Sequence, residues 1–396
     1  MAKIAVMGFG TVGSGVWEII KSKNFEKAAG EDIEVKRILD IRDFDEPEVK
    51  KLLTKDFNDI LNDPEITAVA EVMGGLHPAY EFTKQLLQKG KSVVTSNKEL
   101  VATYGTELLN LACENGVRYL FEASVGGGIP VIAAMTNNLG ANKIKKIMGI
   151  LNGTTNYILT EMFTKGKGFL EVLEKAQELG YAERNPEADV EGYDACRKIA
   201  ILASVAWGKF VDYNDIHTEG ITEVTLDDVK YAEKLDAVIK LIGYADIDEN
   251  DKIYARVSPM IIPKSSPIAN VCDVFNAVML SCDMLGDAMF YGRGAGKLPT
   301  ASAVVSDIIE CQKHKKMHTI LWEASDGETI VPYEEKEVSY MVRIAGDSGK
   351  FGGFEEITGV AQGEKAYITP KMTEKAFAEF ISGCSGVISK IRMYEE

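Results

Sequence analysis

The sequence predicts an α/β protein with three parts: a doubly wound parallel sheet, a second α/β domain and a small α+β C-terminal domain. Its 396 residues are too many for one ordinary hydrophobic core, so several domains are expected. Over residues 1–130, short apolar runs alternate with helical patterns, which is typical of a parallel sheet covered on both faces. Beyond that point helices and strands are mixed, and residues 331–336 have the proline and charge content of a linker.

The first domain, residues 1–130, contains apolar runs typical of strands and segments with helical spacing. Strands are expected at 4–7, 35–40, 68–73, 93–95 and 119–123, and helices at 12–23, 78–89 and 106–115. A later helix, 302–320, is expected to return to this domain. Ligands of such sheets bind beyond the carboxyl ends of the strands, so polar residues there are site candidates.

The second domain is expected over residues 131–300. A helix over 169–179 should stop at Gly180, since a left-handed glycine commonly ends a helix. Residues 194–207 open with charges and continue as an almost wholly apolar helix, which is expected to be buried. A strand over 254–262 precedes Pro263. A C-terminal domain is expected over residues 331–396, in which residues 338–396 form a strand–helix–strand pattern of their own.

The composition excludes several classes of protein. The formal net charge of -16 argues against a nucleic-acid partner, because phosphate binding needs concentrated basic surface. No run of about 18 apolar residues could span a membrane, and the N-terminus lacks the pattern of an export signal. The six cysteines have no C-x-x-C spacing, which fits reduced thiols in the cytoplasm.

A G-x-G-x-x-G motif directly follows the first expected strand and opens the first helix; it consists of Gly8, Phe9, Gly10, Thr11, Val12 and Gly13. The first glycine allows the tight turn, the second allows the backbone to approach a pyrophosphate, and the third lets helix and strand pack closely. The N-terminus of the helix stabilises the phosphate charge. The motif in this context predicts a Rossmann-type dinucleotide-binding domain rather than another glycine turn.

The end of the second strand should recognise the 2′ position of the cofactor, and both Asp40 and Arg42 lie there. Both could equally be solvated charges of a loop. An acidic residue there accepts hydrogen bonds from the ribose of NAD, whereas an arginine pairs with the phosphate of NADP. If the strand includes Asp40, this side chain alternates to the other face and Arg42 alone meets the ribose. If the strand ends at Leu39, Asp40 takes the ribose position and favours NAD.

Three other polar segments are site candidates. Lys98 follows the strand at 93–95 and could meet a carboxylate or transfer a proton, although it could equally be solvated. Glu122 precedes a turn with three consecutive glycines, which could form an oxygen-ligand cation site or a hinge. A polar loop with Asn152 and Thr154 follows an apolar strand at 147–150 and could contact a substrate or simply turn the chain.

The most informative stretch runs over residues 176–198. Asp194 and Lys198 lie one helical turn apart and therefore share a face. A surface salt bridge is the ordinary interpretation of this spacing, but the same helix continues as an apolar rod. Charges at the mouth of a buried helix usually line a cleft, so Lys198 is a candidate proton shuttle and Asp194 could hold an ammonium group.

The stretch 176–198 resembles the signature of the homoserine dehydrogenase family throughout: A-x3-G, a small residue, N-P, D-V-x-G-x-D and x3-K. The segments G-F-G-T-V-G, V-T-S-N-K-E, E-A-S-V-G-G-G-I-P, L-N-G-T-T-N and G-R-G-A-G also resemble this family and follow in the same order. The resemblance covers about residues 1–320. It implies a nicotinamide-dependent enzyme that reversibly reduces L-aspartate 4-semialdehyde to L-homoserine in threonine and methionine biosynthesis.

The resemblance also implies roles for individual residues. Lys198 would be the principal proton donor and acceptor, and Lys98 would be a second essential lysine. Asp194 would be the third catalytic residue. Substrate binding would involve Glu183, Asp194, Lys198, Asn152 and Thr154. Cofactor contacts would come from Gly8, Phe9, Gly10, Thr11, Val12, Gly13, Arg42, Lys98, Gly292 and Gly294. A structural sodium ion would be held by Glu122, Val125, Gly127 and Ile129.

In the family, Arg42 corresponds to a phosphate-binding arginine, so both NADP and NAD are expected to work, with a modest preference for NADP. The second domain would bind the amino-acid substrate and form a homodimer or a dimer of dimers. Residues 339–349 and 387–394 resemble the first and last strands of the ACT module of bacterial members. The segment between them is short, and a second strand is hard to find. A truncated ACT-like domain with a possible amino-acid effector is therefore expected.

Two other interpretations compete with this one. Another dehydrogenase of amino acids or semialdehydes, such as an aspartate dehydrogenase, would share the nucleotide fold but has no reason to carry the whole 176–198 stretch. A nucleotide-sensing transcriptional regulator would need a basic DNA-binding element, which the sequence lacks. Turnover of homoserine with NAD or NADP separates all three.

Overall fold

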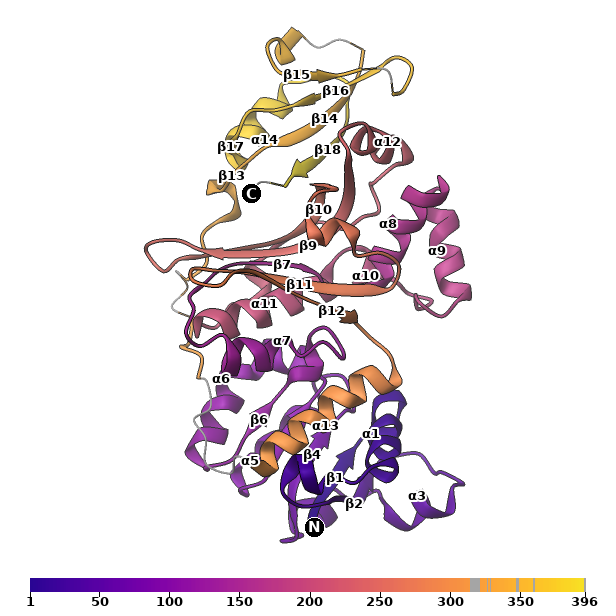
Figure 1. Ribbon diagram of the computed structural model, residues 1–396, viewed down its shortest axis with the longest axis vertical. Helices are drawn as coiled ribbons and strands as arrows, with labels where there is room; N and C mark the ends of the chain where they lie inside the picture. Colours follow the sequence, from indigo (N-terminus) through magenta and orange to yellow (C-terminus); the bar gives the residue numbers. More distant parts are fainter. Residues whose placement is uncertain (314–320, 326, 328, 347–348, 359, 395–396) are drawn as a thin grey trace. The chain divides into compact units, whose positions relative to one another are not determined.

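The structure is a computed structural model that describes residues 1–313, 321–325, 327, 329–346, 349–358 and 360–394. The chain divides into two units. The first consists of Met1–Lys143, Ser204–Asp212 and Gly292–Ser325, and the second of Ile144–Ala203, Tyr213–Tyr291 and Asp326–Glu396. Figure 1 follows the chain through both.

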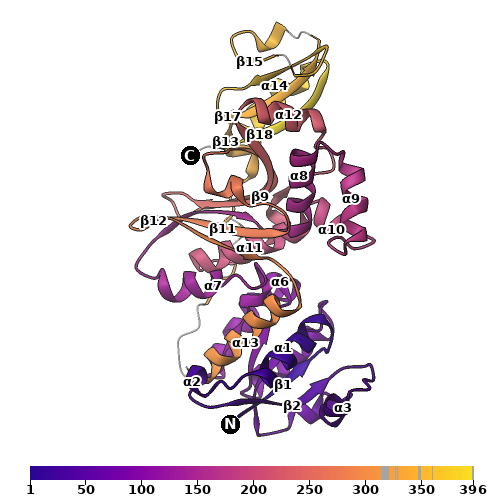
Figure 2. The same ribbon diagram turned by 45° about the vertical axis from the view of Figure 1, so that its right-hand side comes forward.

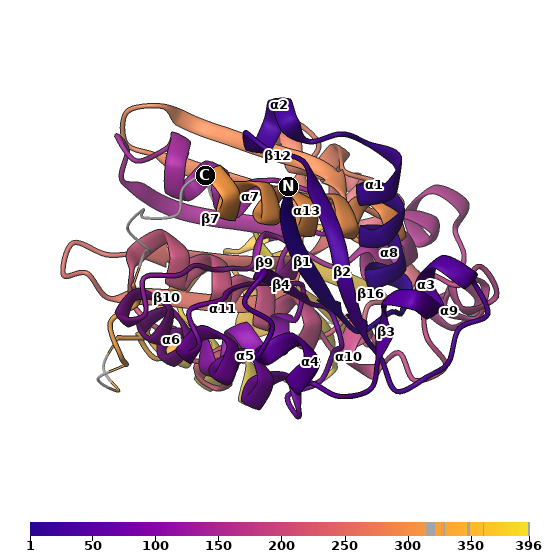
Figure 3. The ribbon, with the colours of Figure 1, turned by 90° about the horizontal axis from the view of Figure 1, so that it is seen from below.

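A six-stranded parallel sheet forms the centre of the first unit (Figure 3). Its strand order is β3 (Leu53–Thr54), β2 (Ile33–Leu39), β1 (Ala2–Met7), β4 (Ile66–Glu71), β5 (Ser92–Thr95) and β6 (Tyr119–Leu120). The direction of winding reverses between β1 and β4, where Met7 is in register with both Leu39 and Glu71. This order is that of dinucleotide-binding sheets, and it confirms the predicted doubly wound fold.

Helices cover this sheet: α1 (Thr11–Ser22), α2 (Glu26–Ala29), α3 (Pro47–Leu52), α4 (Asn58–Leu61), α5 (Ala79–Gln88), α6 (Lys98–Glu114) and α13 (Lys297–Lys313). Figure 2 shows α13 beside α1. A Cβ atom on Gly15 of α1 would lie only 2.8 Å from the carbonyl oxygen of Lys297, so a glycine allows this close packing. Of the predicted helix over 302–320, residues 314–320 lie outside the described part of the chain.

Several predicted boundaries in this unit were wrong, including that of the strand predicted at 68–73, which spans Ile66–Glu71. The helix predicted at 106–115 begins at Lys98, because the side chain of Asn97 accepts the N–H of Leu100 and caps the helix there. The strand predicted at 119–123 ends at Leu120, and Glu122–Ser124 forms a 3-10 turn. The strand predicted at 35–40 ends at Leu39.

A short helix, α7 (Val131–Ala133), and a π-helical turn, Ala134–Asn138, follow the 3-10 turn in the sequence.

A second, largely antiparallel sheet forms the second unit. Its main path is β12 (Gly286–Arg293), β11 (Phe275–Cys282), β7 (Ile144–Ile150), β9 (Ala237–Ile247), β10 (Ile253–Pro263), β18 (Val387–Met393), β14 (Tyr340–Ala345), β16 (Glu364–Ile368) and β15 (Glu355–Ile357). A short strand, β8 (His217–Thr218), also pairs with β10. Because β18 pairs with β10 at Met260–Arg392, the sheet continues from the middle of the chain into the C-terminal segment.

The helices of this unit are α8 (Gly153–Lys165), α9 (Phe169–Glu178), α10 (Glu187–Val190), α11 (Tyr193–Trp207), α12 (Leu226–Lys234) and α14 (Glu374–Ser382). The chain leaves α9 through Gly180 at φ +74°, as predicted. In the C-terminal segment, β15 and β16 lie between β14 and α14 in the sequence, and a short pair forms from β13 (Glu337–Val338) and β17 (Met372–Thr373). Within the described residues, no helix is both long and apolar enough to cross a membrane.

Candidate active site

The glycine motif forms the tight turn between β1 and α1. Gly8 adopts φ +92°, and a Cβ atom there would lie 2.8 Å from the carbonyl oxygen of Val72. A Cβ atom on Gly13 would lie 2.0 Å from the carbonyl oxygen of Gly8. Gly10 precedes α1 without a side-chain cap, so the N-terminus of the helix can meet an anion. The first and third glycines are therefore sterically required, as the motif predicts.

A cavity of about 600 Å³ lies beyond the carboxyl ends of β1, β2 and β4. This volume is in the range of cofactor sites. Its lining combines motif glycines, charged side chains and apolar surface: Gly8, Gly10, Leu39, Asp40, Ile41, Arg42, Lys55, Phe57, Val72, Met73, Gly74, Pro78 and Phe82. Sequence analysis found the glycines, Asp40 and Arg42 but missed Lys55, which belongs to a loop and forms an ion pair with Asp43 at 2.8 Å.

Asp40 is the first residue after β2, and it is buried. Its carboxylate accepts four hydrogen bonds, at 2.7–2.9 Å, from the backbone N–H of Phe9 and from the backbone N–H, Nε and Nη2 of Arg42. The hydrogen bond from the Arg42 side chain is the main reason why the pKa of Asp40 falls to about 2. Asp40 and Arg42 therefore form one unit on the wall of the cavity, at the end of β2.

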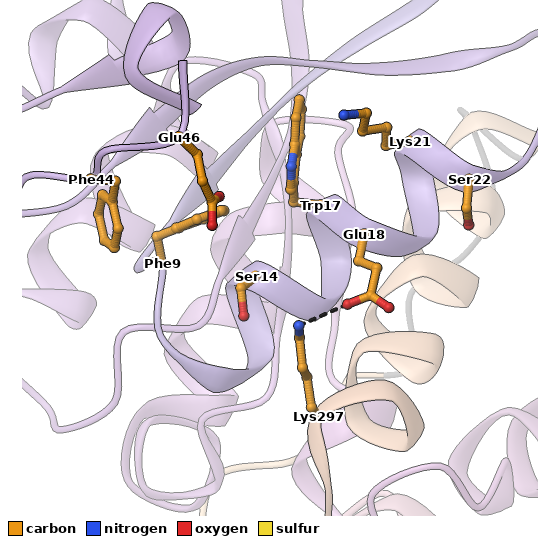
Figure 4. A pocket seen from close by; sticks show the side chains of 9 residues that line it. All are labelled: Phe9, Ser14, Trp17, Glu18, Lys21, Ser22, Phe44, Glu46 and Lys297. Atoms are coloured by element: carbon orange, nitrogen blue, oxygen red, sulfur yellow. Dashed lines mark hydrogen bonds and ion pairs between the residues drawn. The ribbon is translucent and has the colours of Figure 1, made fainter. Parts of the chain in front are cut away.

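Phe9 contributes its backbone to this arrangement, whereas its ring packs against Phe44 at 5.0 Å between ring centroids. Figure 4 shows both rings in a second hollow of about 560 Å³, which is also lined by side chains of α1. Lys297 and Glu18 form an ion pair at 2.7 Å on its wall. Of the other motif residues, Thr11 is exposed and Val12 packs against the core of the first unit.

Polar groups join the ends of β4 and β5. Glu71 is fully buried, and it accepts the hydroxyl of Thr95 at 2.6 Å and the N–H of Met73 at 2.9 Å. Burial raises the pKa of Glu71. Asn97 donates to the carbonyl of Gly75 at 2.6 Å, and Lys98 begins α6 directly after it. Sequence analysis missed Glu71 and Thr95, although polar residues that end buried strands were the available signal.

The Glu122 loop is a buried part of the first unit that contains two carboxyl groups, those of Glu122 and Asp307. The carboxylate of Glu122 accepts the N–H groups of Ile132 at 2.9 Å and Ala133 at 2.6 Å. Burial raises the pKa of Glu122 to about 7. The N–H of Glu122 donates to the fully enclosed Asp307 at 2.9 Å, and desolvation with the nearby Glu122 raises the pKa of Asp307. Asp307 was not found from the sequence.

The glycine turn after Glu122 packs against residues 292–296. A Cβ atom on Gly127, which has φ +58°, would lie 2.5 Å from the carbonyl oxygen of Gly294. A Cβ atom on Gly292 would lie 3.1 Å from the side chain of Ile129. The structure thus brings Gly292 and Gly294 to the turn that carries the suggested sodium ligands. Within the described residues, no cluster of three or more histidine, cysteine or acidic side chains could hold a metal ion.

In the second unit, Lys198 and Asp194 form a buried ion pair on one face of α11. Nζ of Lys198 donates to Oδ2 of Asp194 and to the carbonyl oxygen of Leu151, both at 2.7 Å. Asn152 donates through Nδ2 to Oδ2 of Asp194 at 2.9 Å and to Asp189 at 2.7 Å. Its Oδ1 accepts the N–H of Thr155 and caps α8. Three predicted site residues are therefore directly connected, and Asp189 is an additional member.

Thr154 and Glu183 lie at the border of this cluster. The hydroxyl of Thr154 donates to the carbonyl of Tyr181 at 2.6 Å, which ties the start of α8 to the loop that carries Glu183. Glu183 is exposed, and its backbone carbonyl accepts Nε2 of Gln177 at 3.1 Å. Glu183 is thus the most exposed of the predicted substrate residues, whereas the others are buried.

Comparisons with known proteins give a consistent result. A family model described as "Homoserine dehydrogenase" matches residues 130–309, and one described as "Homoserine dehydrogenase, NAD binding domain" matches residues 8–122. Homoserine dehydrogenase of Synechocystis sp. is 48% identical over 314 residues, which are 78% of this chain and 72% of the relative. That of Bacillus subtilis is 41% identical over 327 residues, which are 80% of this chain and 74% of the relative.

Solved structures agree. A homoserine dehydrogenase from Thiobacillus denitrificans has a TM-score of 0.91 and 37% sequence identity, covering 99% of this chain and 98% of that chain. A hyperthermophilic archaeal homoserine dehydrogenase in complex with NADPH has a TM-score of 0.68 and 30% identity, covering 81% of this chain and 99% of that chain.

Proposed function

The chain belongs to the homoserine dehydrogenase family, and from this premise we propose how its residues divide the reaction. The protein is an NAD(P)-dependent oxidoreductase of amino-acid biosynthesis that reversibly reduces L-aspartate 4-semialdehyde to L-homoserine. Our assignment of the acid–base step to Lys198 rests on the buried ion pair between Lys198 and Asp194. Turnover of homoserine with NADP and NAD, with and without threonine, is the direct test.

Lys198 is the proton donor to the aldehyde oxygen during reduction and the acceptor during oxidation. The bound nicotinamide supplies the hydride that the carbonyl carbon receives. The charge-assisted hydrogen bond to Asp194 and the hydrogen bond to Leu151 fix the direction of the Lys198 amine. We assign Asp194 a second role, in which it positions the substrate through its ammonium group or an oriented water.

The remaining substrate contacts follow from the same cluster. Asn152 is held between Asp194 and Asp189, so its amide can present a fixed hydrogen-bonding edge. Thr154 supports the loop that carries Glu183, whose carboxylate we propose to pair with the substrate ammonium group. Lys98 is proposed as the second essential lysine, since it begins a capped helix beside the ligand-binding edge of the sheet.

Both cofactors are proposed to work, with a modest preference for NADP. Because β2 ends at Leu39, Asp40 would occupy the ribose position, which by itself would favour NAD. However, a carboxylate offers about four lone-pair sites, and four donors already occupy those of Asp40. Asp40 therefore serves to hold Arg42, whose side chain is 56% exposed and can pair with a 2′-phosphate.

A structural sodium ion fits the Glu122 loop through backbone carbonyls. The glycine turn frees carbonyl oxygens, and the carboxyl groups of Glu122 and Asp307 are buried beside it. Burial raises the pKa of both, and a bound cation would stabilise their ionised forms. Because both oxygens of the Glu122 carboxylate already accept N–H groups, the residue is proposed to contribute mainly negative charge. The carbonyls of Val125, Gly127 and Ile129 would then be the ligands.

We further propose a homodimer or a dimer of dimers formed through the second domain, and a cytoplasmic location. All six cysteines are free, which is consistent with a reducing compartment. Residues 331–396 are proposed as a shortened ACT-like domain, supported by the β14, β15, β16, α14 and β18 succession. Whether an amino acid binds there is tested by the kinetics with threonine.

A further inference from the structure

A small basic cavity lies in the second unit, where strands β7, β9 and β10 meet the C-terminal segment (β13 and β18 in Figure 1). Its volume is about 210 Å³. The lining consists mainly of cationic and tyrosine side chains with a single acidic residue: Lys146, Tyr244, Tyr254, Arg256, Met260, Lys336, Glu337, Val338, Lys371, Met393 and Tyr394. Four cationic groups around one small cavity are unexpected in a chain with a net charge of -16.

Arg256 is the central feature of this cavity, because it is only 4% exposed and its donors are incompletely used. Over the described part of the chain, Nε and Nη1 of Arg256 and the hydroxyl of Tyr254 make no hydrogen bond of normal geometry, although the side chains of Arg256 and Tyr254 interact with each other. Nη2 makes only a 3.6 Å contact with the sulfur of Met260. Buried polar groups are normally paired, and an unsatisfied buried donor is costly, so these groups point to a missing acceptor.

The neighbouring carboxylates do not supply that acceptor. Glu374 lies 3.6 Å from Nη1 of Arg256, beyond hydrogen-bonding distance, and accepts Nε of Arg392 at 2.6 Å. Asp246 already accepts the hydroxyl of Tyr244 at 2.6 Å and Nζ of Lys336 at 2.5 Å. Their charges attract the basic groups, but their hydrogen-bonding capacity is directed elsewhere.

Aromatic rings orient the cations around the cavity. The guanidinium group of Arg256 lies 5.3 Å from the ring centroid of Tyr244 and 5.9 Å from that of Tyr254. Lys336 lies over Tyr254 at 5.0 Å, and Lys146 over Tyr394 at 5.7 Å. Cation–π contacts of this kind hold a charge in place without consuming its hydrogen-bond donors.

We propose that this cavity, defined by Arg256, Tyr254, Lys146 and Lys336, binds a small oxyanion, either a phosphate or a carboxylate of up to about four carbons. The guanidinium fork of Arg256 and the hydroxyl of Tyr254 bind its oxygens, and the lysines neutralise its charge. Because residues 336–338 and 393–394 contribute to the wall, the anion stabilises the attachment of the C-terminal segment to β7, β9 and β10.

Titration of the full chain with inorganic phosphate and with succinate, at constant ionic strength, tests the proposal by thermal shift and calorimetry. One of the two anions should bind saturably, one per chain, and raise Tm. Binding of phosphate would identify the ligand as a phosphate, and binding of succinate would identify it as a carboxylate. Absence of saturable binding by both would overturn the proposal. The titration is repeated with saturating homoserine, because a site separate from the substrate retains its affinity, whereas loss of the shift would refute a separate site.

Four variants, one of them a control, locate the site. Arg256→Gln should weaken binding by about tenfold or more, and Lys146→Gln by about threefold to tenfold, since charge-assisted hydrogen bonds are lost or weakened. Lys145→Gln is the matched control, because the neighbouring residue on β7 points to the opposite face and should keep the affinity within about twofold. Tyr254→Phe, expected to bind about threefold more weakly, replaces Arg256→Gln if that variant does not fold. Unchanged affinity in Arg256→Gln or Tyr254→Phe, or equal effects at 145 and 146, would refute the assignment.

Discussion

Nζ of Lys198 lies 2.7 Å from Oδ2 of Asp194, one turn earlier on α11, and both side chains are buried. A buried ion pair is sensitive to the loss of either partner, because the remaining charge is left in a poorly solvated environment. The same carboxylate oxygen also accepts the amide of Asn152. The three side chains therefore form one connected group, and a change in any of them should disturb the others.

Lys198→Ala should lower kcat for homoserine oxidation by roughly two to four orders of magnitude, the usual contribution of a positioned acid–base group. Binding of NADPH, followed by fluorescence, should change little, because Lys198 belongs to the second unit. Lys175→Ala, at an exposed position on α9, is the control and should retain full turnover. A Lys198→Ala enzyme with near-normal kcat would remove this residue from the mechanism.

Asp194→Asn and Glu183→Gln should each lower kcat/KM for homoserine, because a neutral amide replaces a carboxylate that is proposed to face the substrate ammonium group. For Asp194, which is buried, the loss of a charged partner typically costs a few kcal/mol. Asp194→Asn should have the larger effect, since it also removes the partner of Lys198. Glu178→Gln, on the exposed end of α9, is the control. Wild-type kinetics in both variants would mean that the substrate pocket lies elsewhere.

Arg42→Ala should reverse the modest preference for NADPH over NADH. The variant removes the phosphate partner and also leaves Asp40 without its main counter-charge, which then repels a 2′-phosphate. The ratio of the two kcat/KM values is the measurement, and Arg37→Ala on the preceding strand is the matched control. An unchanged ratio in Arg42→Ala would show that Arg42 does not touch the phosphate.

Lys240 provides a prediction about stability and pH. This buried lysine donates to Asn156 at 3.0 Å and to the carbonyl of Val271 at 2.7 Å, and burial lowers its pKa to about 8. Between about pH 8 and the ordinary lysine value of about 10.4, the unfolded chain binds more protons at this position, so raising the pH favours the folded state. The Tm of wild type relative to Lys240→Met should therefore rise over this range. A flat difference would contradict the assignment.

Replacement of sodium chloride by choline chloride, at equal ionic strength, should lower Tm if a sodium ion occupies the Glu122 loop. Glu122→Gln should reduce that difference, because it removes the buried carboxyl group whose ionised form a bound cation would stabilise. Glu114→Gln, at the exposed end of α6, serves as the control. Equal Tm values in both salts for the wild-type protein would count against the ion.

Local features of the sequence determined the parallel sheet and the nucleotide-binding turn. Gly8 has a positive φ and Gly13 packs against the carbonyl of Gly8, both within one β-turn-α unit, and Gly180 ends its helix through its own backbone conformation. Such features depend on residues that are close in the sequence. They can therefore be predicted from hydrophobic periodicity and from the positions of glycines. The spacing of Asp194 and Lys198 likewise places both on one face of their helix, because four residues make about one helical turn.

Other features depended on residues far apart in sequence, and only the tertiary structure decided them. Asp40 was expected either to bind the ribose or to turn away, yet it holds Arg42 and the N–H of Phe9. The strand predicted at 119–123 ends at Leu120, so Glu122 lies outside it. Glu122 instead contacts Asp307, which is 185 positions away in the sequence. The unsatisfied donors of Arg256 likewise result from burial between β10 and the C-terminal segment. Burial and pairing at long range set charge and hydrogen-bonding state, and no local pattern encodes them.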